Sequence, residues 1–323
     1  MAAPVPSPNE PFPRPDNLSQ ATTSHRQGRF VITSRKLPIS KAGPIDAMER
    51  ALGIPVPEMI FGDNVVGVRH LPSGWGVEFN ALDALDAVDK TDRNMLQVAY
   101  ARSWSASREQ TSAGIKDVVK PYDWSYSTTY RGTVVSAPSL PPPPPPPTST
   151  STPAAVPTTT THASTEASEE DATPQEERQK PLLPSFRPTD KPIPIELLKR
   201  RDPILFFDDV MLYESELDDN GISVLSVKVR VHERRMLLLA RLFMRLDGVV
   251  VRVRDTRLYV DFAADEVTRE YTARELGYED VKRKLLMTGL TPDAVTVAMR
   301  DANQFADLLP IVEQTLESVL LRS

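Results

Sequence analysis

The stretch PSLPPPPPPPTSTSTPAAVPTTTTHASTEASEEDATPQEERQK constrains the fold of this chain more than any other feature. It combines a run of seven prolines with Ser/Thr repeats and an acidic run, and it has few large apolar residues. Such a composition cannot bury enough apolar surface to offset the entropy of ordering, so we predict a disordered insert over residues 137–190. Neither flank of the insert looks complete alone. We therefore expect one domain, built from residues 28–136 and 191–323, behind a disordered tail at residues 1–27.

The overall charge balance and the absence of cysteine exclude several classes of function. The chain has 38 basic and 44 acidic residues, a net charge of -6, which disfavours a general nucleic-acid binder. Because the chain has no cysteine, disulfides and thiolate chemistry are ruled out. The same absence is consistent with a reducing, intracellular compartment. The apolar stretch at residues 236–246 is too short and too rich in arginine to span a bilayer, and no signal peptide is visible. We expect a cytoplasmic protein, with the nucleus as an alternative location, and no membrane or nucleic-acid partner.

The first half of the chain reads as short strands and helices. Residues 29–35, 65–70, 75–80 and 94–104 are predicted strands, and Leu71-Pro72-Ser73-Gly74 is a turn between two of them. A helix is expected over residues 44–53, with Pro44 near its start and Gly53 as its stop. Asn80 is placed to cap a further helix that runs through Asp89.

The second half has longer apolar patterns. A strand is expected within residues 192–221, and residues 222–233 alternate as a strand does. Asp247-Gly248 indicates a hairpin within residues 236–262, and the chain beyond Thr268 looks helical, at residues 273–286 and 309–321. Hairpins with flanking helices predict an α+β fold of mainly antiparallel sheets.

The motifs of common enzymes are absent from the sequence. The four histidines (His25, His70, His162 and His232) are far apart, and His70 and His232 are predicted on strand surfaces. FGDN at residues 61–64 is read as a turn, and ESELDDNG at residues 214–221 lacks the ligand spacing of a calcium loop. We expect no catalytic residue, no metal site and no cofactor.

The hairpin around Asp247-Gly248 carries an unusual set of arginines. A two-residue turn pairs Leu246 with Val249, sets Arg241 opposite Arg254, and places Arg252 on the same face. Opposed like charges are unfavourable unless an anion lies between them. Either Asp208, Asp209 or Asp255 neutralises them within the fold, or the hairpin forms a groove for a carboxylate or acidic peptide, for which arginine is well suited.

Two further segments leave alternatives open. Pro141–Pro147 is either a stiff spacer or a polyproline ligand for a partner domain. VKPYDWSYSTTYRG at residues 119–132 alternates Tyr122, Trp124 and Tyr126, which predicts an extended segment whose aromatic face packs in the core or contacts a partner.

Several stretches together resemble the TIPRL-like family of TOR-signalling regulators, which bind catalytic subunits of type 2A and related protein phosphatases. They are PEMIFGDNVV, GVEFNALDAL, VKPYDWSYSTTYRGT, ILFFDDVMLYESELDDNGISVLSVKVRV and RLDGVVVRVRDTRLY. The resemblance implies a mainly antiparallel β architecture and no catalytic activity. In fungi the family is linked to a phosphatase-associated regulatory subunit downstream of TOR.

The resemblance also carries over phosphatase-contact positions. They fall on Asp83, Ile193, Val253 (a Met in animal members) and Asp255, and we add Arg241, Arg252 and Arg254 as candidates for an acidic or C-terminal carboxylate segment. The sequence thus predicts a non-catalytic phosphatase regulator. The alternatives are a scaffold that works through the polyproline insert and an unrecognised hydrolase.

Overall fold

The computed structural model describes residues 18–88, 90, 126–136, 184–217 and 221–321. The predicted strand at residues 94–104, the polyproline run and the aromatic positions 122 and 124 lie outside the described residues. All described elements belong to one compact unit. They combine helices with two antiparallel sheets, which confirms the α+β prediction.

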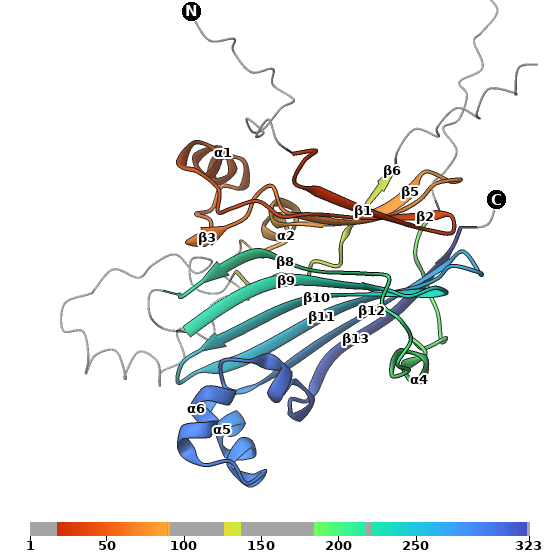
Figure 1. The fold of residues 1–323 in the computed structure, drawn as a ribbon. Coiled ribbons are helices and arrows are strands. Elements are labelled where there is room, and N and C mark those ends of the chain that lie inside the picture. The colour runs from red at the N-terminus through yellow and green to blue at the C-terminus, as the bar shows by residue number, and fades with distance from the viewer. Residues whose placement is uncertain (1–17, 89, 91–125, 137–183, 218–220, 322–323) are drawn as a thin grey trace, which may run out of the picture. The chain divides into compact units, whose positions relative to one another are not determined.

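Two antiparallel sheets form the framework (Figure 1). Sheet A has the order β1-β2-β4-β5-β6, and its strands are β1 (Thr22–Gln27), β2 (Phe30–Arg35), β4 (Val65–His70), β5 (Trp75–Asn80) and β6 (Thr133–Ser136). Sheet B has the order β3-β8-β9-β10-β11-β12-β13-β7. Its strands are β3 (Met59–Ile60), β7 (Arg187–Pro188), β8 (Phe206–Ser215), β9 (Gly221–Val231), β10 (Arg235–Leu246), β11 (Val250–Asp261), β12 (Glu266–Gly277) and β13 (Ile311–Leu320).

The main core lies between the two sheets. Phe30, Trp75 and Phe79 of sheet A and Val227 and Met236 of sheet B are among its fully buried members. The alternation predicted for β9 is confirmed, because Val227, Val229 and Val231 are buried while Lys228 and Arg230 are exposed. Burying a large apolar side chain contributes about 1.5–3 kcal/mol, so this layer holds the sheets together.

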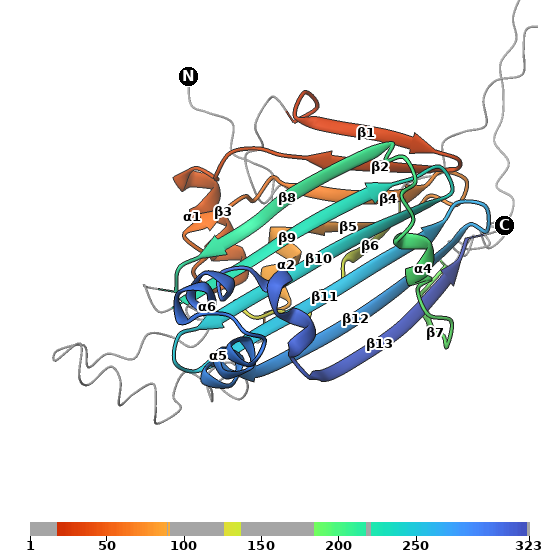
Figure 2. The same ribbon diagram turned by 60° about the horizontal axis from the view of Figure 1, so that its bottom comes forward.

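Helices cover the outer face of sheet B, the face turned away from sheet A (Figure 1). The helices α5 (Tyr278–Met287) and α6 (Pro292–Ala298) and the short turns η2 (Ala302–Gln304) and η3 (Ala306–Leu308) form a second core with the β10–β11 hairpin. The short helix α4 (Ile195–Leu198) lies at the other end of the strands (Figure 2). Between these two ends no described helix covers the outer face of sheet B.

The first two helices lie close to the positions that local sequence signals predicted. The helix α1 (Ala42–Leu52) ends at Gly53, whose φ of 69° is the left-handed conformation that glycine adopts without strain. In α2 (Ala81–Asp86) the Asn80 side chain accepts a hydrogen bond from the Asp83 backbone N–H, as predicted. α1 begins two residues before Pro44, and α2 ends three residues before Asp89.

Several predicted boundaries were wrong. The strand β1 occupies residues predicted as disordered tail, and β7 occupies residues predicted as disordered insert. The helix predicted at residues 273–286 is confirmed from Tyr278 onward, where α5 begins, but is wrong for residues 273–277, which belong to β12. The helix predicted at residues 309–321 is wrong, because this segment forms β13. Ion pairs across the ladder, such as that of Arg269 with Glu317, stabilise a strand whose composition favours a helix.

Candidate functional site

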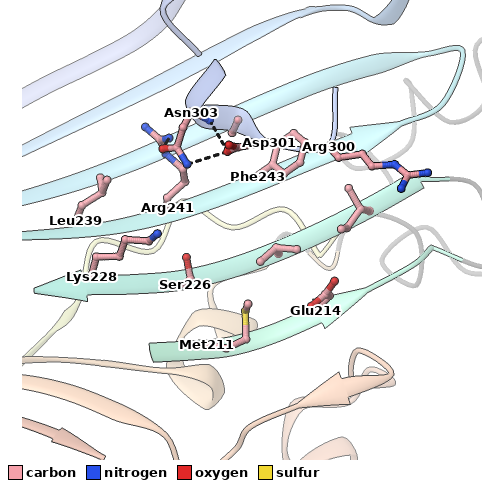
Figure 3. A pocket seen from close by; sticks show the side chains of 13 residues that line it. Met211, Glu214, Ser226, Lys228, Leu239, Arg241, Phe243, Arg300, Asp301 and Asn303 are labelled. Carbon is pink, nitrogen blue, oxygen red and sulfur yellow. Dashed lines mark hydrogen bonds between the residues drawn. The ribbon is translucent and has the colours of Figure 1, made fainter. Parts of the chain in front are cut away.

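The open part of sheet B holds a groove of about 250 Å³. Its floor consists of side chains of β8, β9 and β10, and one wall is the segment 300–303 (Figure 3). It is lined by Met211, Glu214, Ile222, Val224, Ser226, Lys228, Leu239, Arg241, Phe243, Arg300, Asp301, Ala302 and Asn303. We call this surface the sheet B groove. Its lining is mixed, with apolar side chains beside the charged groups of Glu214, Lys228, Arg241, Arg300 and Asp301.

An ion pair organises the groove wall. Arg241 donates from Nε and Nη2 to the two carboxylate oxygens of Asp255, at 2.7 Å each, and from Nη1 to Asn303 Oδ1 at 2.7 Å. Burial lowers the pKa of Arg241, but the hydrogen bonds and charge of Asp255 outweigh it and raise the pKa above its ordinary value. Asp255 is 2% exposed and also accepts from Arg257 at 3.1 Å. Its single charge therefore faces two guanidinium groups, of which Arg257 also donates to Glu270 at 3.4 Å.

The hairpin register differs from the predicted one, and this changes the arrangement of the arginines. Leu246 pairs with Val250, not Val249, because the turn has three residues and Gly248 takes the left-handed φ of 74°. The one-residue shift puts Asp255 opposite Arg241 and sends Arg252 and Arg254 to the other face of the sheet. The predicted opposition of Arg241 and Arg254 was therefore wrong. For Arg241 the first of the two predicted alternatives applies, because Asp255 neutralises its charge within the fold.

Arg252 and Arg254 lie on the inner face, on the side of sheet A. Arg252 donates to Glu275 Oε2 at 2.5 Å and is 7% exposed. Arg254 has no ion pair or hydrogen bond from its side chain to any described residue, and burial lowers its pKa. The nearby rings of Tyr213 and Tyr271 are buried. These two arginines are therefore outside the sheet B groove.

Val253 and Ile193 lie at opposite ends of sheet B. Val253 is fully buried beneath the α5–α6 helices, in the second core. Ile193 is 5% exposed just before α4, next to Lys191, which pairs with Glu266 at the far end of β12. Eight strand positions separate Val253 from that end, on the order of 26 Å.

Asp83 belongs to the sheet A side of the molecule. Its Oδ2 accepts hydrogen bonds from Asn80 Nδ2 at 2.8 Å and from the Thr133 hydroxyl. The Tyr130 hydroxyl lies 3.0 Å from the same threonine oxygen, and burial raises its pKa. The structure thus brings Arg241, Val253 and Asp255 together and leaves Asp83 and Ile193 apart from them.

The aromatic segment is described only from Tyr126 onward. Tyr126 is 4% exposed in the main core, and its carbonyl accepts from the Tyr213 hydroxyl at 2.9 Å. For this residue the core interpretation is confirmed. The strand that follows it, β6, is the last described element before the insert.

The two strand histidines are not surface residues, contrary to prediction. His232 is 6% exposed and contacts the Pro203 carbonyl through Nδ1. His70 is 1% exposed, with Nδ1 2.8 Å from Ser73 Oγ and Nε2 3.6 Å from Asp265 Oδ1. Among the residues the structure describes, no cluster of three or more His, Asp or Glu side chains has the geometry to hold a metal ion. Nor does any described helix have the length and apolar character to cross a membrane.

Sequence patterns did not indicate that the segment 300–303 lines the groove. This segment lies about 60 residues away from Arg241 along the chain, and only tertiary packing brings it to the groove. The sequence does hold one local signal, the Asp301 side chain, which accepts from the Asn303 backbone N–H in an Asx turn.

The described residues thus define an α+β scaffold of two antiparallel sheets, with an arginine held in place by Asp255 on the outer face of sheet B. Comparison with known proteins specifies the family. The TIP41-like family model matches residues 59–282, and the chain belongs to this family.

Curated relatives match over most of the chain. The type 2A phosphatase activator TIP41 of Saccharomyces cerevisiae is 34% identical over 98% of this chain and 78% of its own length. The human TIP41-like protein is 35% identical over 92% of this chain and 90% of its own. A third relative, the type 2A phosphatase activator tip41 of Schizosaccharomyces pombe, is 28% identical over 80% of this chain and 84% of its own.

Proposed function

We propose that this protein is a non-catalytic regulator in TOR signalling that binds a type 2A phosphatase catalytic subunit or its associated regulatory subunit. The observation that carries the proposal is the similarity, over nearly the whole chain, to a yeast protein named as a type 2A phosphatase activator. We further propose a cytoplasmic location, which suits a chain without cysteine.

The sheet B groove is the proposed contact surface. Arg241 presents a guanidinium held in place by Asp255, and Met211, Val224 and Leu239 supply apolar surface beside it. Asp255 and Asn303 engage three of the five guanidinium N–H donors of Arg241, and the other two, on Nη1 and Nη2, are available to a ligand carboxylate. The proposed ligand is therefore an extended phosphatase segment that carries an acidic side chain or a C-terminal carboxylate.

The remaining candidate residues have different roles in the proposal. Val253 supports the helices beside the groove, whereas Asp83 and Ile193 are separate contacts of a partner that reaches beyond it. Arg254, which has no ion pair among the described residues, is a second position for an anion on the inner side of the sheet. Arg252, paired with Glu275, lies beside it.

A bulky substitution in the groove tests the contact surface. Ser226→Tyr fills the groove floor without adding a charge beside Arg241 or removing a hydrogen bond of the fold. We expect pull-down of purified type 2A catalytic subunit to weaken at least about tenfold, which corresponds to about 1.4 kcal/mol. Thermal unfolding should change little, since surface substitutions usually stay within about 0.5 kcal/mol.

Ser24→Tyr on the exposed side of β1 is the matched control and should bind as the wild type does. Equal binding by Ser226→Tyr and the control would place the contact elsewhere, and Asp83→Leu then tests the sheet A side. Deletion of residues 140–183, which spares β7, separates this proposal from a polyproline scaffold. The groove proposal expects retained binding in that variant.

A further inference from the structure

A second surface, at the end of sheet B away from α5 and α6, is both basic and apolar. We call it the basic end. It consists of the loop that follows α4, the first residues of β8, and the turn between β9 and β10. Its members are Arg200, Arg201, Ile204, Leu205, Phe207, Arg230 and Arg234.

Backbone contacts hold these segments against one another. The Leu205 N–H donates to the Val231 carbonyl at 2.8 Å, and His232 Nδ1 lies 2.9 Å from the Pro203 carbonyl oxygen. Phe207 and Arg230 are direct partners in the β8–β9 ladder and so share a face. The basic end is therefore one surface, although its residues come from three parts of the chain.

The arginines of the basic end have no counter-charge in the described fold. The acids next to them are already engaged: Asp202 pairs with Arg235, Glu196 with Lys199, and Asp209 with Lys228. None of the four arginine side chains has an ion pair or hydrogen bond to a described residue. The remaining exposed acid on this surface, Glu233, leaves four positive charges against one negative charge.

Large apolar side chains are exposed between these arginines. Phe207 is 54% exposed, Ile204 50% and Leu205 46%. Clustered exposed apolar residues beside uncompensated charges indicate a surface that is covered by another segment. The occupant should be acidic and extended.

We propose that the acidic run of the chain's own insert, Glu166–Glu177, docks on the basic end. The run holds Glu166, Glu169, Glu170, Asp171, Glu176 and Glu177, and the whole of residues 137–183 has only two basic side chains, Arg178 and Lys180. These six acids are opposite in sign to the basic end, whose four arginines exceed its one exposed acid by three charges. The run lies outside the described residues, so the proposal rests on its sequence and on where the chain returns to the fold.

The chain returns from the insert at the same end of sheet B. Arg187 of β7 pairs with Ser318 of β13, and this position lies in one row across the sheet with Phe207 and Arg230. The row crosses seven strands, from β8 through β9, β10, β11, β12 and β13 to β7, which is about 29 Å at about 4.8 Å per strand.

The tether is long enough for this distance. Asp171 and Pro184 are 13 positions apart, and a flexible chain of that length has a typical end-to-end distance of about 20 Å and an upper limit of about 45 Å. A tether of this length gives an effective concentration in the millimolar range, so even a weak, salt-sensitive contact is populated. An acidic peptide of another protein or an anionic lipid surface lacks this advantage.

A label at a single site tests the docking in the full chain. Because the chain has no cysteine, Ala172→Cys gives one unique site for a nitroxide spin label. We expect loss of the amide signals of Leu205 and Arg234 in the oxidised state, with signals of α5 unaffected. The double variant Arg200→Glu with Arg201→Glu should restore these signals, as should about 1 M salt, where the screening length is about 3 Å.

The matched control reverses two basic residues at the opposite end of sheet B. Lys282→Glu with Arg283→Glu on α5 should leave the signal loss at the basic end unchanged. Undiminished Leu205 and Arg234 signals in the labelled wild type would overturn the proposal. If vesicles of phosphatidylserine and phosphatidylcholine then sediment with the wild type but not with the Arg200/Arg201 variant, the basic end is a lipid-binding surface instead.

Discussion

At the scale of single residues, Asp255 is both a proposed contact position and the buried acid that holds Arg241 in the groove. It is 2% exposed and accepts hydrogen bonds from Arg241 and Arg257. The sequence suggested Asp255 as one of three possible neutralising acids but could not choose among them. The choice depends on a one-residue difference in turn length, and the Asp-Gly pair is compatible with both turns.

Asp255→Asn should destabilise the fold by about 3 kcal/mol. The substitution keeps the shape but leaves Arg241 without its anion and Arg257 with Glu270 alone, and breaking one side of a buried pair is costly. Chemical denaturation monitored by fluorescence measures this loss. The double variant Arg241→Met with Asp255→Leu should recover much of the stability, and equal stability of Asp255→Asn and the wild type would contradict this account of the ion pair.

At the scale of elements, the strands with clean alternation or clear turns were predictable and the polar ones were not. β4 and β5 match their predicted bounds, because Leu71-Pro72-Ser73-Gly74 supplies an unambiguous turn. β12 and β13 were read as helices, since Glu, Ala, Arg and Leu favour a helix locally. Their ladder partners, distant in sequence, decide otherwise. The groove was unpredictable for the same reason, because it needs β8, β9, β10 and the segment 300–303 together.

Gly221 marks the point where β9 must approach β10 most closely. A methyl group at this position would meet the Arg245 carbonyl oxygen at 1.9 Å, so the backbone would have to move. Gly221→Ala should therefore cost at least about 3 kcal/mol in thermal or chemical unfolding. Gly43→Ala, in α1 with open space around it, is the matched control and should be neutral or stabilising by up to about 1 kcal/mol. A mild effect at Gly221 would mean that the strands separate more easily than their ladder indicates.

At the scale of the whole molecule, polar links join the sheets, and two of them are centred on the buried acids Asp208 and Asp265. In one, the Asp208 carboxylate accepts from the Ser34 hydroxyl at 2.5 Å and from the Lys36 ammonium. Burial alone would raise the pKa of Asp208, but the hydrogen bonds from Lys36 and Ser34 lower it. In the other link His70 faces Asp265, which is paired with Arg29 at 2.6 Å. Sequence patterns do not reveal such links, because their members come from different sheets.

The His70 link makes stability depend on pH. Burial lowers the pKa of His70 below 6.5, and the Asp265 charge offsets this only in part, so the folded state favours the neutral ring. The unfolded chain takes up a proton first as the pH falls. The contribution of His70 to the free energy of unfolding is therefore fully present above about pH 6.5 and declines below it. We expect the melting temperature of the wild type to drop between pH 7.5 and pH 5.5, and His70→Gln to drop less over the same range. An identical pH dependence in both proteins would remove His70 as its source.

The place of β13 in the chain has a consequence for biosynthesis. Sheet B from β8 to β13 is built in chain order, so each new strand pairs with the one made just before it. Between β12 and the end of β13, however, the ribosome adds roughly 40 residues, including α5 and α6. At about 5–20 residues per second this leaves the β12 edge unpaired for about 2–8 s in every nascent chain. Exposed strand edges are sites of wrong pairing, so this interval is when the protein depends most on chaperones.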